Sequence, residues 1–307
     1  MRTALIATVL NEAEGMGEFL ASIEAQTRIP DAIVVTDGGS TDGTQDRLRT
    51  FAASTSLPFQ FSEVPGTRSV GRNAAIRASG ADVVAVTDVS VLDPHWFERI
   101  LAPLEGGKAD VVAGWYEVLT ETRKARAMGL LTQFSPDQID PKTFLPSSRS
   151  IAFTRAAWES VGGYPEAYAE SEDTVFDISL REAGLQFAFA PQAMVRWRPP
   201  DTLSEAYRME GRYSEGDGEA GVHLWSYTRY SLLYGAYTGG LALFLLGFLW
   251  PLAWFLLGVL AVVYALFRLR KVLFEGLLSQ VPYGLLVVLV LDVARIRGYL
   301  RGRLRRS

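Results

Sequence analysis

Asp37–Thr44, with the sequence DGGSTDGT, follows the apolar run Ala32–Thr36 and precedes a helix that is expected from about Gln45. An acidic residue at the end of a buried strand, followed by glycines and a hydroxyl-rich helix start, is how an α/β protein presents a carboxylate to a nucleotide. The same residues also fit a tight turn in which Asp42 and Gln45 form a capping box. The neighbouring strands favour the nucleotide-binding interpretation.

Apolar runs with the length and β-branching of buried strands lie on both sides of this stretch. They are Ala4–Val9, Ile33–Thr36 and Val83–Thr87, with a more exposed run at Phe59–Phe61. Helical patterns of apolar residues separate these runs up to about residue 110. This alternation predicts an α/β fold with a mixed, mainly parallel sheet that helices cover on both faces.

Polar side chains follow three of the predicted strands. Asn11 and Glu12 follow the first strand, Asp37 the second and Asp88 the fourth. In open parallel sheets, ligands bind outside the carboxyl ends of the strands, where the strand order reverses. Turn chemistry alone explains such a set poorly, so a ligand site is predicted at this edge.

The composition limits the chemistry of that site. The chain has no cysteine, and His95 and His223 are its only histidines. Disulfides, thiolate metal sites and cysteine nucleophiles are therefore excluded. Any metal is expected to be a hard ion that binds carboxylates and phosphates.

The charge is distributed unevenly along the chain. Residues 268–307 contain nine Lys and Arg against Glu275 and Asp292, a balance of +7, and the other 267 residues carry −11. The body contains no basic patch interleaved with aromatic residues, so no nucleic-acid partner is expected. A basic tail beside apolar segments indicates anionic membrane lipids instead.

The first residues only faintly resemble a signal peptide. The apolar run Ala4–Leu10 is short, and Asn11 and Glu12 end it without a small-residue cleavage site. We interpret it as a buried strand, which predicts that the body of the protein stays in the cytoplasm.

The middle of the chain is less regular. Val111–Val118 is a further predicted strand, and the polar loop Pro146–Ser150 leads into the apolar run Ile151–Phe153. A helix is expected from Arg155, ending at a Gly-Gly turn, and Ser171–Asp173 is expected to open another.

The C-terminal region has the composition of a membrane anchor. Tyr230–Phe267 contains no charged residue over 38 positions, nearly twice the ~20 that cross a bilayer once. Because Pro251 lies near its midpoint and disfavours helix continuation, two transmembrane helices are predicted, at about 231–249 and 251–267. An α/β domain is thus expected over 1–225 and an anchoring region over 226–307.

The next apolar stretch, residues 276–291, is too short for a comfortable span. If it crossed the membrane, the arginines of the tail would lie outside, against the positive-inside rule. It is therefore expected to lie in the interface or to re-enter, with the basic tail on anionic headgroups.

Taken with these features, the Asp37–Thr44 stretch resembles the Asp-(Asp/Gly)-Gly-Ser-x-Asp-x-Thr pattern of the family-2 glycosyltransferases, inverting enzymes with the GT-A-type fold. The resemblance covers about residues 1–220. It implies that Asp37 bonds the uracil of a UDP-sugar, which suits a carboxylate because uracil carries an imide N–H. It also implies that Thr8, Asn11 and Glu12 contribute to nucleotide-sugar binding.

Two further motifs concern the donor phosphates. Gly71-Arg72-Asn73 is similar to the family's Ala-Arg-Asn, whose arginine lies near the nucleotide, although a solvated helix start has the same appearance. Asp88-Val89-Ser90 stands where the family usually has a metal-binding Asp-x-Asp. The resemblance implies Mg²⁺ or Mn²⁺ on Asp88, with phosphate oxygens and water completing the octahedron. Because Ser90 replaces the second carboxylate, this ion is expected to bind weakly and only with the nucleotide.

Glu172-Asp173, which follows Gly162-Gly163-Tyr164-Pro165, resembles the family's Glu-Asp motif, in which the aspartate is the catalytic base. Inversion by a single displacement requires a base on the acceptor side. By themselves, the two acids also fit a helix start that complements the helix dipole. After the glycine turn, the resemblance favours a catalytic role for both residues.

Several residues in family-like surroundings are predicted as donor or acceptor contacts, and an ordinary surface role fits them equally well. They are Ser90, Arg149, Trp197, Arg212 and Tyr213. Residues 212–218 are expected to form a loop that closes on donor or acceptor. The segment Asp93–Trp96 resembles the family's Pro-x-Trp and is interpreted as packing.

The predicted function is transfer of a sugar from a nucleotide-diphospho-sugar to a hydroxyl of a lipid-linked or cell-envelope glycan at the cytoplasmic membrane. Two alternatives stay open. A polyprenyl-phosphate glycosyltransferase is disfavoured because a phosphate acceptor needs no base, and because such enzymes tend to carry Asp-Ala-Asp-Leu-Gln where this chain has Asp88–Leu92. An inactive nucleotide-sugar-binding membrane module is disfavoured by the intact Glu172-Asp173 pair.

Overall fold

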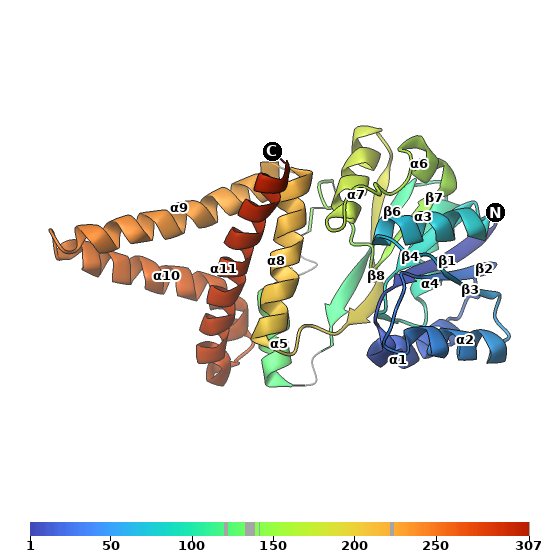
Figure 1. Cartoon of the computed structure of the whole chain (residues 1–307), viewed down its shortest axis with the longest axis horizontal. Coiled ribbons are helices and arrows are strands. Elements are labelled where there is room, and N and C mark those ends of the chain that lie inside the picture. Colours follow the sequence, from blue (N-terminus) through green and yellow to red (C-terminus); the bar gives the residue numbers. More distant parts are fainter. Residues whose placement is uncertain (120–121, 133–138, 141, 222–223, 307) are drawn as a thin grey trace. The chain divides into compact units, whose positions relative to one another are not determined.

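The structure is a computed structural model, and it describes residues 1–119, 122–132, 139–140, 142–221 and 224–306. By its contacts the chain divides into two compact units (Figure 1). The first consists of Met1–Glu117 and Ser135–Arg198, and the second of Val118–Phe134 and Pro199–Ser307. The domain boundary expected at residue 225 lies inside the second unit.

A mixed sheet forms the centre of the first unit. Among the described residues it has eight strands in the order β3-β2-β1-β4-β7-β6-β8-β5. Their bounds are β1 Thr3–Val9, β2 Ala32–Asp37, β3 Phe59–Glu63, β4 Val83–Thr87, β5 Val91–Leu92, β6 Val111–Val118, β7 Ile151–Thr154 and β8 Phe187–Trp197.

The strand order reverses at β1. This strand pairs in parallel with β2 on one side and with β4 on the other, and β3 pairs in parallel with β2. The carboxyl ends of these strands therefore meet at one edge, as the sequence predicted. The strand β7 is antiparallel to both β4 and β6, which makes the sheet mixed.

Helices cover both faces of this sheet. The helices α1 (Ala13–Glu24), α2 (Thr44–Ser54) and α4 (Trp96–Glu105) pack on one face, and α3 (Arg68–Ser79), α6 (Arg155–Ser160) and α7 (Glu172–Glu182) on the other. The alternation of strand side chains creates this division, because Leu5 and Ala7 join the first core and Ala4 and Ile6 the second. The predicted α/β architecture is confirmed.

The strand β8 has no counterpart among the predicted elements. It spans eleven residues and contains Pro191, which lacks a backbone N–H and weakens any strand signal in the sequence. It lies between β6 and β5 in the sheet, and its Val195 and Arg196 pair with Leu92 and Val91 of β5. Trp197 therefore ends a sheet strand.

The second unit is helical. Its elements are α5 (Arg123–Thr132), α8 (Leu203–Ala220), α9 (Leu224–Leu246), α10 (Leu252–Phe274), the short 3₁₀ helix η2 (Leu278–Gln280) and α11 (Val281–Arg306). The predicted turn at Pro251 separates α9 from α10. Among the described residues, Leu252–Phe274 and Leu278–Arg306 are long and apolar enough to cross a membrane, and Leu232–Leu246 is a shorter apolar helix.

Helices α8 and α11 lie side by side (Figure 1), and glycines bring their backbones together. A Cβ atom added at Gly298 would lie 2.3 Å from the carbonyl oxygen of Gly211. One added at Gly302 would lie 2.0 Å from the carbonyl oxygen of Glu215. Such contacts exclude any side chain at Gly298 and Gly302.

The prediction of a loop at residues 212–218 was wrong, because these residues lie inside α8. The helix begins with a complete capping box in which Thr202 and Glu205 bond each other's backbone N–H groups. Glycine is required at position 218 because the backbone of α11 passes close to it. A Cβ atom added at Gly218 would lie 2.4 Å from the carbonyl oxygen of Tyr299.

A buried polar cluster joins α8, α9, α10 and α11. Asp292 is fully buried and accepts hydrogen bonds from Arg268 at 2.6 Å and from the hydroxyls of Tyr237 and Tyr264. Arg295 pairs with Glu210 on α8. Each charge is thereby compensated inside the helix bundle.

Candidate active site

The predicted nucleotide loop is organised around the carboxylate of Asp37. Its Oδ1 accepts hydrogen bonds from the backbone of Gly39 and Ser40 and from the side chain of Gln45, and Oδ2 accepts one from the Ser40 hydroxyl at 2.5 Å. Burial opposes ionisation, but these hydrogen bonds outweigh it and hold the pKa of Asp37 below its ordinary value. Asp37 itself is fully buried.

The capping box that the sequence left open does not form at this helix. Helix α2 begins at Thr44 with Gly43 as its N-cap, and Gln45 bonds Asp37 instead. Asp42 accepts hydrogen bonds from the backbone of Thr44 and of Ala13. The stretch is therefore a built loop that connects to the end of β1.

Asn11 and Glu12 join this loop at the end of β1. The side chain of Asn11 accepts from the backbone of Thr41 at 2.9 Å, and its backbone donates to Ser40. The backbone of Glu12 donates to the Thr44 hydroxyl at 2.8 Å. Asn11 has a φ of 55°, a conformation that asparagine tolerates better than most residues. The structure thus brings three predicted nucleotide contacts, Asn11, Glu12 and Asp37, into one hydrogen-bonded edge.

Thr8 lies within β1, three residues before Asn11. Its hydroxyl is 2.9 Å from that of Thr36 on the neighbouring strand. A Cβ at Gly71 would lie 2.5 Å from the Thr8 side chain, so glycine allows α3 to pack directly on β1. The predicted nucleotide contact of Thr8 stays a prediction.

Asp88 follows β4, and both of its oxygens have partners. Oδ1 accepts from the Ser90 hydroxyl, and Oδ2 lies 3.1 Å from Nε of Arg149. Burial raises the pKa of Glu12 to about 7, and the Asp88 carboxylate adds to the rise, although part of Glu12 remains exposed. Asp88, Ser90 and Arg149 are thereby brought together.

The donor set at Asp88 does not by itself fit a divalent cation. Ser90 and Arg149 occupy the two oxygens of its carboxylate. In the described part of the chain, no group of three or more His, Asp or Glu side chains could hold a metal. Mg²⁺ and Ca²⁺ sites rely on several free oxygen ligands. An ion at this position would depend on the donor phosphates for its ligands.

The second group of predicted residues lies at the start of α7. The helix opens at Glu172 and Asp173, as predicted, after Ser171 with a φ of 59°. The carboxylate of Asp173 accepts from the backbone of Thr174 at 2.9 Å and of Ser148 at 3.4 Å. The positive φ of Ser171 is a strained conformation, and such conformations occur where the surrounding structure fixes them beside functional residues.

Arg72 contacts Glu172. The Nη1 atom of Arg72 lies 2.6 Å from Oε1 of Glu172, and both side chains are more than 90 % buried. The guanidinium also lies over the ring of Tyr164, 5.2 Å from its centroid. Burial and the Asp173 carboxylate raise the pKa of Glu172, and Arg72 opposes the rise. The pair fixes the residue next to Asp173, while the predicted nucleotide contact of Arg72 stays a prediction.

Sequence reasoning assigned no role to Asn73, yet it clamps the glycine turn before α7. Its side chain donates to the carbonyl of Tyr164 and accepts from the backbone of Tyr164 and from the indole of Trp158. A Cβ at Gly163 would lie 2.9 Å from the Asn73 side chain. The position of Asn73 next to Arg72, and the Gly-Gly turn before α7, are the sequence features that could have indicated this role.

Asp177 was also missed. It lies one turn after Asp173, is 1 % exposed, and has no hydrogen-bond partner for either oxygen among the described residues. Burial, followed by the Asp173 carboxylate, raises the pKa of Asp177 well above its usual range. A protonated carboxyl is the favoured state in such surroundings.

One loop connects the two groups of residues. Ser148 contacts Asp173, Arg149 contacts Asp88, and Ser150 accepts from the Trp96 indole and donates to the carbonyl of Ala193. A Cβ at Gly114 would lie 1.9 Å from the Ser150 hydroxyl, so the loop sits directly on β6.

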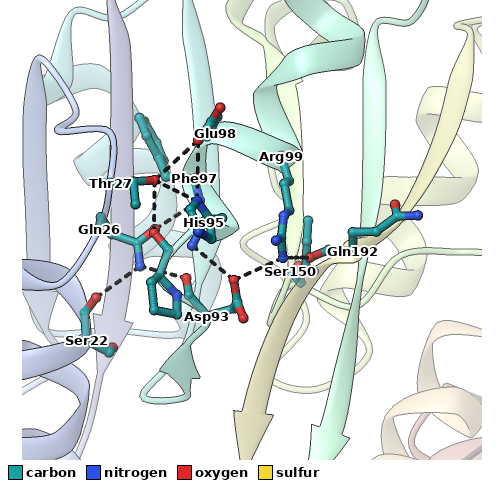
Figure 2. Close-up of polar contacts among 12 residues, drawn as sticks. Ser22, Gln26, Thr27, Asp93, His95, Phe97, Glu98, Arg99, Ser150 and Gln192 are labelled. Atoms are coloured by element: carbon teal, nitrogen blue, oxygen red, sulfur yellow. Dashed lines mark hydrogen bonds and ion pairs between the residues drawn. The ribbon is translucent and has the colours of Figure 1, made fainter.

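The turn that positions Trp96 is built from ordinary packing and hydrogen bonds, as interpreted from the sequence. Figure 2 shows Asp93 accepting from the His95 backbone and from Arg99, both at 3.0 Å. The side chain of Gln26 donates to the carbonyl of Asp93 and accepts from the backbone of Phe97. This network fixes Trp96, which is fully buried, and through it Ser150.

Arg212 and Tyr213 belong to α8 in the second compact unit, and their predicted donor or acceptor contacts stay predictions. Trp197 lies in the first unit, where its ring packs on Arg149 with 4.5 Å between the guanidinium carbon and the ring centroid.

Comparisons with known proteins agree with this fold. The chain matches the family described as Glycosyl transferase family 2 over residues 4–158, and Glycosyl transferase family group 2 over residues 83–291. Each match spans more than half of the chain. The chain therefore belongs to glycosyl transferase family 2, and it is a glycosyltransferase.

Two curated relatives match most of the chain. Glycosyltransferase AglE of Haloferax volcanii is 26 % identical over 240 residues, covering 75 % of this chain and 76 % of the relative. Succinoglycan biosynthesis protein ExoA of Rhizobium meliloti is 22 % identical, covering 69 % of this chain and 68 % of the relative.

Solved structures share the fold. The mannosyltransferase PcManGT from Pyrobaculum calidifontis, in complex with GDP-Man and Mn²⁺, is 17 % identical with a TM-score of 0.63, covering 100 % of this chain and 88 % of its own. TarS 1–349 from S. aureus, in complex with UDP-GlcNAc, is 16 % identical with a TM-score of 0.52, covering 70 % and 66 %. The predicted GT-A-type fold is confirmed.

Proposed function

We propose that this glycosyltransferase moves a sugar from a UDP-linked donor to a hydroxyl of a lipid-linked or cell-envelope glycan, with inversion. The position of Asp173 carries the proposal. It is partly exposed at the start of α7, while the residues behind it, Arg72 and Glu172, are buried and paired. A carboxylate held in this way is suited to act as a general base.

The donor side is supported by the loops at the ends of β1 and β2. Solved relatives contain GDP-Man, UDP and UDP-GlcNAc, which supports a nucleotide-sugar as donor. We place the nucleoside against Asn11, Glu12 and Asp37. A uracil N–H on Asp37 must share Oδ2 with the Ser40 hydroxyl, which lies 2.5 Å from it here.

The proposed step is a single displacement. Asp173 takes the proton of the acceptor hydroxyl as its oxygen bonds to the anomeric carbon. The bond from that carbon to the diphosphate breaks, and its electron pair leaves with the diphosphate. Positive groups near the leaving phosphates lower the barrier, because charge develops there in the transition state. Asp88 with Arg149 and Ser90 lies at the edge where those phosphates are expected.

The test uses the purified full-length chain and a panel of nucleotide-sugars. We expect one donor to bind and to release nucleoside diphosphate slowly without acceptor and faster with membrane glycolipids. Binding without any release, with or without acceptor, would leave only the binding-module alternative. Release that depends on polyprenyl phosphate and survives removal of the Asp173 carboxylate would favour that other acceptor class.

We further propose that α9 and α10 anchor the enzyme as a membrane hairpin, with its catalytic unit in the cytoplasm. The absence of charge over residues 230–267 and the exposed apolar side chains of α10 support the hairpin. The cluster Arg268–Lys271 at its end supports the orientation, since basic residues favour the cytoplasmic side.

A further inference from the structure

We propose that Arg149 is the cation that neutralises the donor diphosphate in this chain, in place of a protein-held divalent ion. The proposal rests on the proposed function, because it requires a nucleotide-diphospho-sugar donor. It assigns to Arg149 and Trp197 a phosphate-binding role at Asp88.

The position of Arg149 is fixed by its loop. Its neighbours Ser148 and Ser150 are bound to Asp173 and to the carbonyl of Ala193, respectively. The guanidinium reaches the Asp88 carboxylate, which follows β4 at the edge where donor phosphates are expected. The same short loop therefore contacts both the base and the residue beside the leaving group.

Aromatic rings hold the guanidinium in place. Its central carbon lies 4.5 Å from the ring centroid of Trp197 and 5.6 Å from that of Tyr116. Such contacts stabilise a cation and restrict its side chain before a ligand arrives. A preorganised cation requires little rearrangement when negative charge develops, so it stabilises a transition state well.

The donors at this point suit phosphate. Arginine presents its N–H groups in a planar fork that matches phosphate oxygens, and the Nε of Arg149 lies 3.1 Å from the Asp88 carboxylate. The indole Nε1 of Trp197 is buried and has no acceptor among the described residues. An unsatisfied buried donor beside an arginine is accounted for by an oxygen ligand.

The residues around the Asp88 carboxylate support the same role for Arg149. Ser90 supplies a hydroxyl where a second carboxylate would be needed to bind an ion, and it donates to Asp88. When the sugar–phosphate bond breaks, the electron pair passes to the diphosphate, and Arg149 compensates that charge. Asp173 keeps the proton of the acceptor, so both charges of the step have a partner on the chain.

The test measures binding of UDP and of uridine to the full-length protein by calorimetry, with EDTA and with Mg²⁺ or Mn²⁺. We expect wild-type UDP affinity to change less than about threefold between these conditions. Arg149→Met should weaken UDP binding about 10–100-fold and leave uridine binding unchanged, with partial recovery in Arg149→Lys. Arg28→Met is the matched control, since Arg28 also pairs with a carboxylate, with 2.8 Å between its Nη1 and an oxygen of Glu105.

The outcomes separate the two proposals. Wild-type UDP affinity that vanishes in EDTA and returns with the metal would overturn the role of Arg149 while supporting the donor class. Equal losses for UDP and uridine in Arg149→Met would show a structural role only. Failure of every nucleoside diphosphate to bind the wild-type protein would contradict the proposed function itself.

A separate observation concerns α11. Its side chains Leu286, Leu289, Val293, Leu300 and Leu304 are each 44–75 % exposed. At 100° per residue these positions fall within about 60° of one another. The opposite face carries Val287, Leu291, Gly298 and Gly302, which pack on neighbouring helices of the second unit. An exposed leucine stripe therefore runs along the whole helix.

From this stripe we infer that α11 lies in the plane of an anionic membrane surface and does not cross the bilayer. Arg297 and Arg301 border the stripe on one side and Arg303 on the other, which matches acidic headgroups. The helix that packs against α11, α8, carries seven charged side chains and cannot enter hydrocarbon. The stripe is continuous with the apolar anchor that precedes it in the chain.

The cysteine-free chain allows a direct test in proteoliposomes. A fluorophore on Leu300→Cys should be quenched by lipid-borne quenchers at least twofold more than one on Arg301→Cys, and more in anionic than in neutral vesicles. Equal quenching at both sites would overturn the orientation. In intact cells, labelling of Ser307→Cys by an impermeant reagent from outside would show that the helix crosses.

Discussion

Buried arginine–carboxylate pairs occur in both units of the chain, and they differ in what lies beside them. In the first unit, Arg72 and Glu172 are buried, but the next residue, Asp173, remains partly exposed. In the second unit, Asp292 is fully buried and its partners include two tyrosine hydroxyls as well as Arg268. The first pair positions a reactive neighbour, whereas the second joins helices and exposes no reactive group.

The largest expected effect tests the first half of this comparison. Asp173→Asn should lower sugar transfer about 10²–10⁴-fold, because the amide cannot accept the acceptor proton. The melting temperature and the donor affinity should stay close to wild type, since the base acts in the transition state. Near-normal turnover, or an equal loss of donor affinity, would contradict the assignment of Asp173.

The second prediction is a loss of stability with little change in activity, the reverse of the result expected for Asp173→Asn. Asp292→Asn should destabilise the protein by about 3–5 kcal/mol, because it leaves Arg268 without its buried countercharge. Activity per folded molecule should change little. Thermal unfolding in detergent, together with transfer assays below the transition, measures both quantities. Arg270→Met, at a partly exposed position of the same helix as Arg268, is the control. A selective loss of turnover with unchanged stability would indicate a functional role for the cluster.

The smallest effect concerns Asp177, a buried carboxyl without a partner among the described residues. Its pKa is raised in the folded protein, so the stability it contributes is present at low pH and declines as pH rises above about 4. Asp177→Asn removes this titration. The variant should lose less stability than wild type between pH 4 and pH 8, as measured by urea unfolding. Parallel pH profiles would show that Asp177 is ionised in the folded state.

The strands and helices of the site could be predicted because each is encoded locally. Ala4–Val9 and Val83–Thr87 are continuous apolar runs, and Asp37 is followed by the glycines that its turn requires. The start of α7 at Glu172 follows a glycine turn and two acids. The strand β8 escaped prediction because Pro191 interrupts its pattern, and α8 because its glycines have the composition of a loop.

The partners of the charged residues could not be predicted in the same way. Arg72 meets Glu172 one hundred residues later in the chain. Arg149, just before β7, meets Asp88, just after the neighbouring strand β4. The sequence shows that both arginines are present, but it does not show which carboxylate each one meets. Arg72 contacts the buried Glu172, whereas Arg149 contacts the partly exposed Asp88. The packing of α3 and of the Ser148–Ser150 loop decides which.

The sequence by itself determined the family, the α/β alternation, the acids at the strand ends and the apolar C-terminal region, because local patterns of charge, glycine and hydrophobicity encode them. Only the tertiary structure decided that Arg72 supports Glu172, that Arg149 shares Asp88 with Ser90, and that α8 packs on α11 through Gly298 and Gly302. Those contacts join residues far apart in the chain, and the order of the strands and the close approach of backbones bring them together.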